Sequence, residues 1–406
     1  CALCLLGATR PLAADPPPPS RQALDTAIER GVAWLLEEQK PVGTWGSGKH
    51  ALGKTALAVF TLLHCGLAEG QDTKASKRLA RAFRYVDKTG AGRSKRRETD
   101  SRTYEASLLL MLLRARGRAA DRERMQRIAT LLTKTQAPNG QWWYDGDGAR
   151  HRSGGDNSNT QFATLALGQA HGAGLKIGLS TMPRALAWWV SSPGKKGGFG
   201  YASGGSPKSA ATGSMTAAGI ACMAIARTIT GDGQADKDAG HVSVTKAAQV
   251  QRAATDFLAD VFSVTKNHGP AIDRKGQRQR HSGRGWLHYY LWTVERAMVL
   301  SGQEKLGNLD WYAAGAKHLL DSQKKDGSWR GEHPLYATCF ALLFLTRAAD
   351  RPRAFTPGPQ PLEPGAQRGP TVTPHGEPQV PGPQQPDDKP SPEAPTPPPG
   401  TVLDWL

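Results

Sequence analysis

Hydrophobic positions recur with a period of about 3.6 residues along most of residues 20–350, which predicts amphipathic helices rather than strands. The predicted helices alternate between a more polar and a more apolar type, giving six pairs. The more polar helices are predicted at 21–38, 73–87, 119–135, 181–191, 244–262 and 310–322. The more apolar helices are predicted at 52–66, 103–116, 159–172, 213–229, 286–300 and 336–348.

One turn pattern, Q-x-x-x-G-x-W, follows three of the more polar helices, at Gln39–Trp45, Gln136–Trp142 and Gln323–Trp329. A fourth, degenerate copy has Phe199 in place of the tryptophan. Glycine after a helix supplies the positive φ that ends it. The Trp ring is expected to pack back onto the turn, and the Gln amide to bond free backbone groups at helix ends. These turns are therefore predicted to fasten each hairpin to its neighbour.

Apolar helices without a polar face must be buried on most sides. Stacking six helix pairs into a closed ring, with the apolar helices inside, achieves this, so we predict an all-α fold, an α/α toroid. An open superhelix of the same hairpins is the alternative. Threonines near the starts of five inner helices are expected to cap free N–H groups; they are Thr55, Thr103, Thr160, Thr216 and Thr338.

The two ends of the chain differ from this repeat. Residues 1–14 form a short apolar run closed by small residues, as in the remnant of a secretory signal peptide. A lipid-anchored Cys1 is the alternative there. Residues 351–406 are Pro-rich and are expected to form a disordered, extended tail. The toroid domain is therefore assigned to 20–350. We expect export to the periplasm or cell envelope, with no segment of transmembrane length.

The chain is basic, with a formal net charge of +17. Much of the excess lies in two runs in predicted loops, Arg93–Arg97 and Arg274–Arg284, without interleaved aromatic residues. Such runs are usually solvated loops, but they also favour attraction to anionic components of the cell envelope. Export makes nucleic acid an unlikely partner.

The Q-x-x-x-G-x-W turns resemble the QW repeats of squalene–hopene and oxidosqualene cyclases, whose toroid also occurs in protein prenyltransferase β-subunits. The resemblance covers nearly all of residues 20–350. It is closest to the exported prenyltransferase/squalene-oxidase-repeat proteins of planctomycete-type bacteria. Segments similar to Gly155–Ala163 and His288–Arg296 recur in those proteins, whose activity is generally unassigned. The resemblance implies the α/α toroid and leaves the activity open.

The catalytic acid of the cyclases is not retained. Squalene–hopene-type cyclases begin their reaction with an Asp in a D-x-D-D-T-A motif at the start of an inner helix. The similar frame here is Asp156–Gln161, in which Ser158 stands where the acid is expected. Because a hydroxyl cannot protonate an alkene, this resemblance does not carry the cyclase step. Asp156 is interpreted first as a helix N-cap and second as an acid in another geometry.

The zinc site of the prenyltransferases is not retained either. Those enzymes bind zinc through an Asp-x-Cys pair and a His on the next inner helix. Trp286 and His288 align with the pair, and Ala337 aligns with the His, so one ligand of three is present. We therefore expect no metal and no cofactor. A different metal site formed by His288 with His281 and His333 is the alternative.

Two groups of residues are the candidate ligand-binding site. The first group consists of polar side chains around the start of one inner helix, suited to a glycan or peptide: Asp156, Asn157, Asn159 and Gln161. Its alternative interpretation is an elaborate N-cap. The second group lies on the aromatic inner helix and suits an apolar, isoprenoid or carbohydrate ligand: His288, Tyr289, Trp292 and Glu295. Its alternative is ordinary core. A carboxylate in an apolar helix either pairs with an Arg or faces the cavity as a functional group.

Three functions follow from these observations. A binding module that holds a ligand in the central cavity or at its rim ranks first, because it needs neither the missing acid nor zinc. A structural envelope scaffold with a plugged cavity ranks second. A terpenoid-cyclase-like enzyme with a non-standard acid, Asp156 or Glu295, ranks third. No residue is assigned as catalytic.

Overall fold

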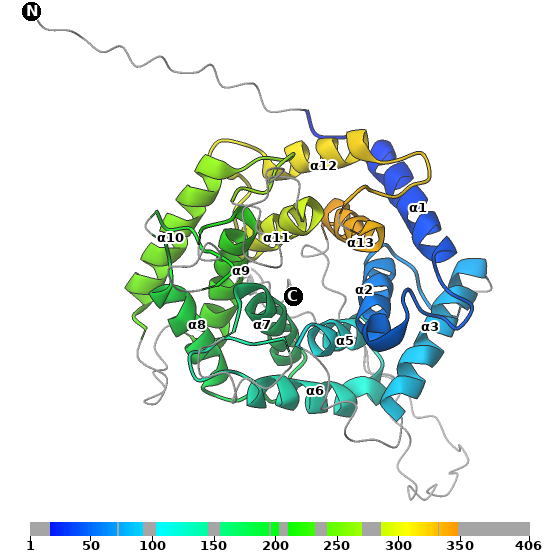
Figure 1. Cartoon of the computed structure of the whole chain (residues 1–406), viewed down its shortest axis with the longest axis horizontal. Helices are drawn as coiled ribbons and strands as arrows, with labels where there is room; N and C mark the ends of the chain where they lie inside the picture. The colour runs from blue at the N-terminus through cyan, green and yellow to red at the C-terminus, as the bar shows by residue number, and fades with distance from the viewer. Residues whose placement is uncertain are drawn as a thin grey trace, which may run out of the picture.

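The computed structural model describes residues 17–70, 73–91, 103–144, 155–194, 196–202, 210–231, 242–269, 286–331 and 333–347. Twelve α helices of these residues form two concentric rings (Figure 1). The outer ring consists of α1 (Arg21–Glu37), α3 (Lys74–Ala91), α6 (Arg122–Lys134), α8 (Thr181–Ser191), α10 (Val244–Val261) and α12 (Trp311–Ser322). The inner ring consists of α2 (Ala51–His64), α5 (Thr103–Arg116), α7 (Asn157–Gly172), α9 (Gly213–Thr230), α11 (Leu287–Leu300) and α13 (Pro334–Leu345).

The ring is closed. Each inner helix contacts the next from α2 through α13, and α13 in turn contacts α2. The last outer helix, α12, contacts the first, α1, so the two ends of the repeat meet (Figure 1). All twelve predicted helices are present, and the predicted α/α toroid is confirmed in preference to the open superhelix.

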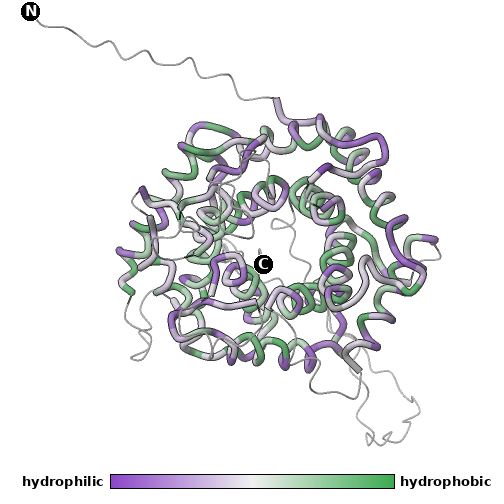
Figure 2. The backbone as a smooth tube through the Cα atoms, viewed as in Figure 1, coloured by the Kyte–Doolittle hydropathy of each residue, from purple (hydrophilic) through white to green (hydrophobic). Residues whose placement is uncertain are grey.

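Burial explains why the two types of helix take different rings. The inner helix α9 is buried continuously from Gly213 to Ala226. The outer helix α1 buries only a stripe with a spacing of four residues, Ala27, Gly31 and Leu35. Hydrophobic positions accordingly dominate the inner ring, and hydrophilic positions lie toward the outer rim (Figure 2). Within the described part of the chain, no helix has the length and apolarity needed to cross a membrane.

The last Q-x-x-x-G-x-W turn shows how the motif works. The Gln323 amide donates to the carbonyl of Gly327 at 2.9 Å and to that of Ala27 on α1 at 2.8 Å. The Trp329 indole N–H donates to the carbonyl of Leu319 at 2.8 Å, at the end of the preceding helix. Gln39 and Gln136 each bond their own turn and the following outer helix in the same way.

The glycines of these turns lie directly against the following outer helix. Gly327 has a φ of +90°, and a Cβ there would lie 2.3 Å from the carbonyl oxygen of Arg30 on α1. Gly140 has a φ of +94°, with a Cβ 2.2 Å from the carbonyl oxygen of Arg184 on α8. Only glycine satisfies both the backbone angle and the close approach. The prediction that the turns fasten neighbouring hairpins is confirmed, and the last turn closes the ring.

The predicted capping role is wrong for four of the five threonines. The hydroxyls of Thr55, Thr160 and Thr338 accept from the backbone N–H groups of the turn tryptophans at 3.2–3.3 Å. Thr216 accepts from the N–H of Phe199 at 3.0 Å in the degenerate turn. These threonines lie one turn inside their helices, so their hydroxyls tie the preceding loop to the helix instead of capping it.

Several predictions fall outside the described residues. They concern the signal-peptide remnant 1–14, the tail 351–406, both basic runs and His281. Three cysteines lie in the described part, Cys65, Cys222 and Cys339, and all three are free thiols. Cys222 and Cys339 are buried, as expected for small apolar side chains.

Candidate functional site

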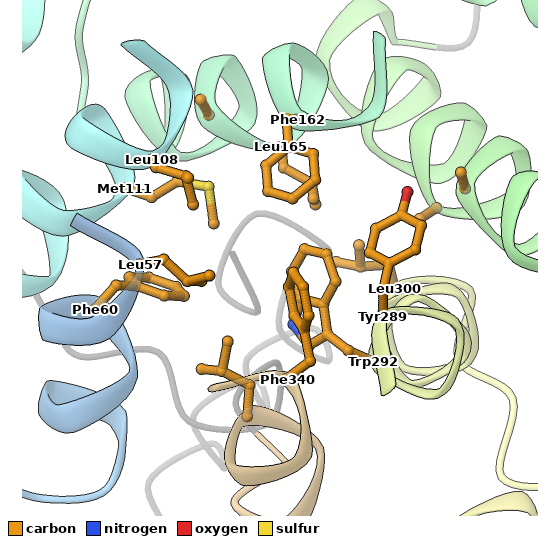
Figure 3. Packing of buried hydrophobic residues seen from close by; sticks show 14 of the residues in the cluster. Leu57, Phe60, Leu108, Met111, Phe162, Leu165, Tyr289, Trp292, Leu300 and Phe340 are labelled. Carbon is orange, nitrogen blue, oxygen red and sulfur yellow. The ribbon is translucent and has the colours of Figure 1, made fainter. Parts of the chain in front are cut away.

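Large apolar side chains from five inner helices point toward the middle of the ring (Figure 3). They occur mostly in pairs three residues apart, which places both members on one helix face. The space that they enclose is called the central chamber here; its lining includes Leu57, Phe60, Leu108, Met111, Phe162, Leu165, Tyr289, Trp292 and Phe340. Each of these side chains is buried.

One side of the central chamber is aromatic. Phe162 on α7, Tyr289 and Trp292 on α11 and Phe340 on α13 form a continuous cluster, called the aromatic wall below. The ring centroids are 5.5 Å apart for Phe162 and Trp292 and 5.0 Å apart for Trp292 and Phe340. Tyr289 lies 5.6 Å from Phe340. These separations are those at which aromatic rings attract one another. Tyr289 and Trp292, predicted as candidates from the sequence, therefore lie together.

The start of α7 carries a buried polar cluster centred on Asp156. One carboxylate oxygen accepts from the Ser158 hydroxyl at 2.7 Å and from the backbone N–H groups of Ser158 and Asn159 at 3.0 and 2.9 Å. The other accepts from the Asn159 amide at 2.7 Å. The N-cap interpretation of Asp156 is confirmed. Burial raises the pKa of Asp156, and the donated hydrogen bonds act against that rise.

Two tyrosines join this polar cluster to the aromatic wall. The hydroxyl of Tyr104 is 2.5 Å from that of Ser158, and its ring packs edge-on against Phe162 at 5.0 Å. The hydroxyl of Tyr289 donates to the side-chain oxygen of Gln161. Burial raises the pKa of both phenols, so both are protonated at neutral pH and act as neutral hydrogen-bonding groups.

A donor and an acceptor of the polar cluster have no hydrogen-bond partner among the described residues. They are the amide nitrogen of Gln161 and the amide oxygen of Asn159. Both side chains are completely buried. A buried polar atom without a partner costs about 1–3 kcal/mol, which a ligand supplying the complementary groups would recover.

Asn157 has a different role from its neighbours. Its side-chain nitrogen donates to the Gly200 carbonyl at 2.8 Å. Its oxygen accepts from the Gln141 amide at 3.1 Å and from the Trp188 indole at 2.8 Å. The Asn157 amide therefore joins the loop before α7 to α8 and to the loop before α9.

The remaining candidates lie on α11 beside the aromatic wall. His288 is buried, and burial lowers its pKa to about 4, so it is neutral at neutral pH. Glu295 pairs with the Nε of Arg296 at 2.9 Å, which is the first of the two roles expected for it. Within the described residues, no group of three or more His, Cys, Asp or Glu side chains is placed to hold a metal ion.

The buried carboxylates all have partners in the described part of the chain. Asp121 pairs with Arg116, Glu295 pairs with Arg296, and Asp156 accepts the four hydrogen bonds given above. A general acid must instead be protonated when it meets the substrate, and hydrogen bonds donated to a carboxylate favour its charged form. The arrangement is therefore suited to enclosing an apolar molecule with a polar end.

Sequence reasoning missed three residues of this site, Tyr104, Tyr144 and Tyr201. The hydroxyls of Tyr144 and Tyr201 contact each other. The ring of Tyr144 lies 5.6 Å from that of Tyr104. Each of the three comes from a different hairpin connection or helix, so no local spacing in the sequence indicated them.

No protein-family model matches this chain, and no curated protein matches it. Among solved structures, the apo form of type II terpene cyclase MstE from Scytonema is similar, at 16% identity and a TM-score of 0.51. That match covers 82% of this chain and 99% of the cyclase chain.

Two further MstE structures contain bound molecules. The complex with merosterolic acid A, its product, has a TM-score of 0.48 at 16% identity, covering 81% of this chain and 98% of that one. The complex with geranylgeranyl dihydroxybenzoate, its substrate, has a TM-score of 0.47 at 14% identity, covering 80% and 96%. The match to the apo form shows that this chain has the terpene-cyclase type of α/α toroid.

Proposed function

We propose that the protein binds an isoprenoid-class molecule in its central chamber, with the apolar chain against the aromatic wall and the polar end at Asn159 and Gln161. The observation that carries this proposal is that the aromatic wall and the polar cluster at the start of α7 are in direct contact. Tyr104 and Tyr289 contact the aromatic wall with their rings and the polar cluster with their hydroxyls. Sites for small molecules usually combine such an apolar lining with a few polar groups that fix orientation.

The similarity in fold supports the choice of ligand class. The similar structure is named as a terpene cyclase, and terpenoids are isoprenoid compounds. This likeness favours the terpenoid-cyclase-like alternative over a binding module for glycans or peptides. The likeness extends to the architecture but not to the catalytic acid of the squalene–hopene-type cyclases, because Ser158 stands at the position of that acid in the motif frame.

Conversion of the bound molecule is the second candidate function. It is favoured by Asp156, whose buried carboxyl has a raised pKa and lies one hydrogen bond from Ser158. Binding ranks first because four hydrogen bonds stabilise the charged form of this carboxylate. Export to the cell envelope and attraction to its anionic components stay predictions from the sequence.

The test is a calorimetric titration of the protein with geranylgeraniol, an uncharged C20 isoprenoid alcohol. We expect saturable binding that Trp292→Leu weakens about tenfold, since an aromatic contact contributes about 0.5–1.5 kcal/mol beyond its area. Trp311→Leu is the matched control, because Trp311 is equally buried but lies on the outer helix α12. Absence of binding, or equal weakening by both variants, would contradict the proposal.

The same incubation separates the two candidate functions. Binding alone predicts that the extracted alcohol is chemically unchanged when examined by gas chromatography and mass spectrometry. A cyclised product that disappears in Asp156→Asn would establish conversion instead. A product formed equally by Asp156→Asn would exclude Asp156 as its acid.

A further inference from the structure

A buried guanidinium lies on the chamber side of α11. Tyr289 and Trp292 face the chamber (Figure 3), and at about 100° per residue Arg296 falls between them on the helix surface. The guanidinium carbon of Arg296 is 5.7 Å from the centre of the Trp292 ring. Tyr290, on the other side of the helix, packs toward Phe262 at the end of α10. Arg296 therefore belongs to the chamber lining.

The hydrogen bonds of Arg296 are incomplete. Its Nε donates to Glu295 at 2.9 Å, while its Nη2 has no hydrogen-bond partner among the described residues. The residue is 1% exposed, so bulk water does not reach that donor. An unmet donor on a charged group costs more than one on a neutral group. The chamber thus contains a donor that lacks an acceptor, in addition to the polar cluster at the start of α7.

The neighbouring charge limits what the acceptor can be. Glu295 is completely buried and is bonded to Arg296, so a negative charge already lies beside the guanidinium. An anionic ligand group would place a second negative charge beside Glu295 in a region of low dielectric constant. A carbonyl or hydroxyl oxygen accepts the same hydrogen bond without that repulsion.

The position of Arg296 along the helix distinguishes it from the polar cluster. Arg296 lies seven residues after Tyr289, which bonds Gln161 of that cluster. Seven residues correspond to a rise of about 10 Å along α11. The two polar positions are therefore at different depths of the chamber, with aromatic side chains between them.

We propose that Arg296 donates from Nη2 to a neutral oxygen at the inner end of the ligand, so that the ligand is an isoprenoid oxygenated at both ends. This inference rests on the proposed function, because it assumes that the chamber binds an isoprenoid chain. It predicts selection for a second oxygen of carbonyl or hydroxyl type, remote from the first.

The test compares three C20 isoprenoid alcohols of equal length, whose far ends carry a methyl group, a ketone or a carboxylate. We expect the wild-type protein to bind the ketone about tenfold more tightly than the methyl compound. The carboxylate is expected to bind no more tightly than the ketone. Trp311→Leu on the outer helix is expected to keep the preference for the ketone.

The variant Glu295→Gln with Arg296→Met removes both charges together, because Arg296→Met alone would leave a buried carboxylate without its arginine. We expect the ratio of the two dissociation constants to fall from about ten to about one. Arg296→Lys, which keeps the charge but not the planar fork, is the second variant and should lower the ratio in part.

Equal affinities of the wild-type protein for the ketone and methyl compounds would overturn the inference and leave the proposed function standing. If the carboxylate compound bound most tightly, the inference that Arg296 donates to a neutral oxygen would be overturned. Failure of all three compounds to bind would instead contradict the proposed function itself.

Discussion

Replacing Gly327 by Ala tests whether the last turn holds the two ends of the ring together. The added Cβ would lie 2.3 Å from the carbonyl oxygen of Arg30 on α1, and contacts below 3.0 Å are essentially never found. The turn and α1 must therefore separate by at least 0.7 Å, the difference between those two distances. The hydrogen bonds from Gln323 to Ala27 and from Arg30 to Lys324 span this contact.

Two contributions make up the loss of unfolding free energy expected for Gly327→Ala. An alanine at a φ of +90° costs about 1–2 kcal/mol in backbone strain. Weakening the two hydrogen bonds across the contact adds about 2 kcal/mol, at about 1 kcal/mol each. Gly66→Ala is the matched control, since Gly66 has a φ of +96° and a Cβ there would meet nothing within 4 Å. The control should show the strain alone.

Urea unfolding of the two variants measures this difference. We expect Gly327→Ala to lose about 2 kcal/mol more of the unfolding free energy than Gly66→Ala, from the two hydrogen bonds. Hydrogen exchange should also become faster in α1 and the last turn than elsewhere, because the ring opens at that contact. Equal losses in both variants, with unchanged exchange in α1, would refute the closure of the ring by this turn.

Three further predictions concern buried polar groups. Asp156→Ala should lower the unfolding free energy by about 2 kcal/mol, and Asp156→Asn by less, as measured by urea unfolding, because the N-cap bonds to α7 are lost. Burial lowers the pKa of His288 to about 4. As the pH falls, His288 therefore takes up its proton in the unfolded protein before it does so in the folded protein. The contribution of neutral His288 to the unfolding free energy should be fully present above about pH 6.5 and should fall by up to about 3 kcal/mol toward pH 4. The unfolding free energy of His288→Gln, measured by urea unfolding at a series of pH values, should lack this part of the pH dependence. Arg116→Met should cost about 3–5 kcal/mol, because the buried Asp121 loses its partner, whereas Arg118→Met, at a more exposed pair, should cost at most about 1 kcal/mol in the same assay.

The fold could be predicted because its determinants are local. The helix period needs only a window of neighbouring residues, and each turn motif spans seven residues, as in Gln136–Trp142. Closure of the ring was predicted from the repeat, but its contacts were not. The hydrogen bond from Gln323 to Ala27 joins residues 296 positions apart, and no sequence pattern specifies such a pair.

The roles of single polar residues were less predictable. Thr160 lies near a helix start, where a capping role is a sound expectation. In the structure, Asp156 already caps α7, and the Thr160 hydroxyl instead accepts from Trp142 in the preceding turn. Proximity in sequence gives the position of a hydroxyl along a helix, but the packing of the loop decides which donor reaches it.

The candidate site could be predicted only in part, because only some of its residues are neighbours in the sequence. Asp156, Asn159 and Gln161 stand together in one segment, so their cluster was visible in the sequence. Tyr104 reaches the cluster from another inner helix, 54 residues away from its partner Ser158. The free donor of Arg296 depends on which protein groups lie within reach, a three-dimensional property that its neighbour Glu295 alone did not indicate.

The most direct test of the central claim is native mass spectrometry of the protein purified from its own host, followed by extraction and identification of any molecule it retains. We expect one isoprenoid-class molecule for each protein chain, lost or reduced in Trp292→Leu and kept in the outer-ring control Trp311→Leu. A protein that carries nothing and binds no added isoprenoid would contradict isoprenoid binding in the central chamber, as would a stoichiometric glycan or peptide in place of the isoprenoid.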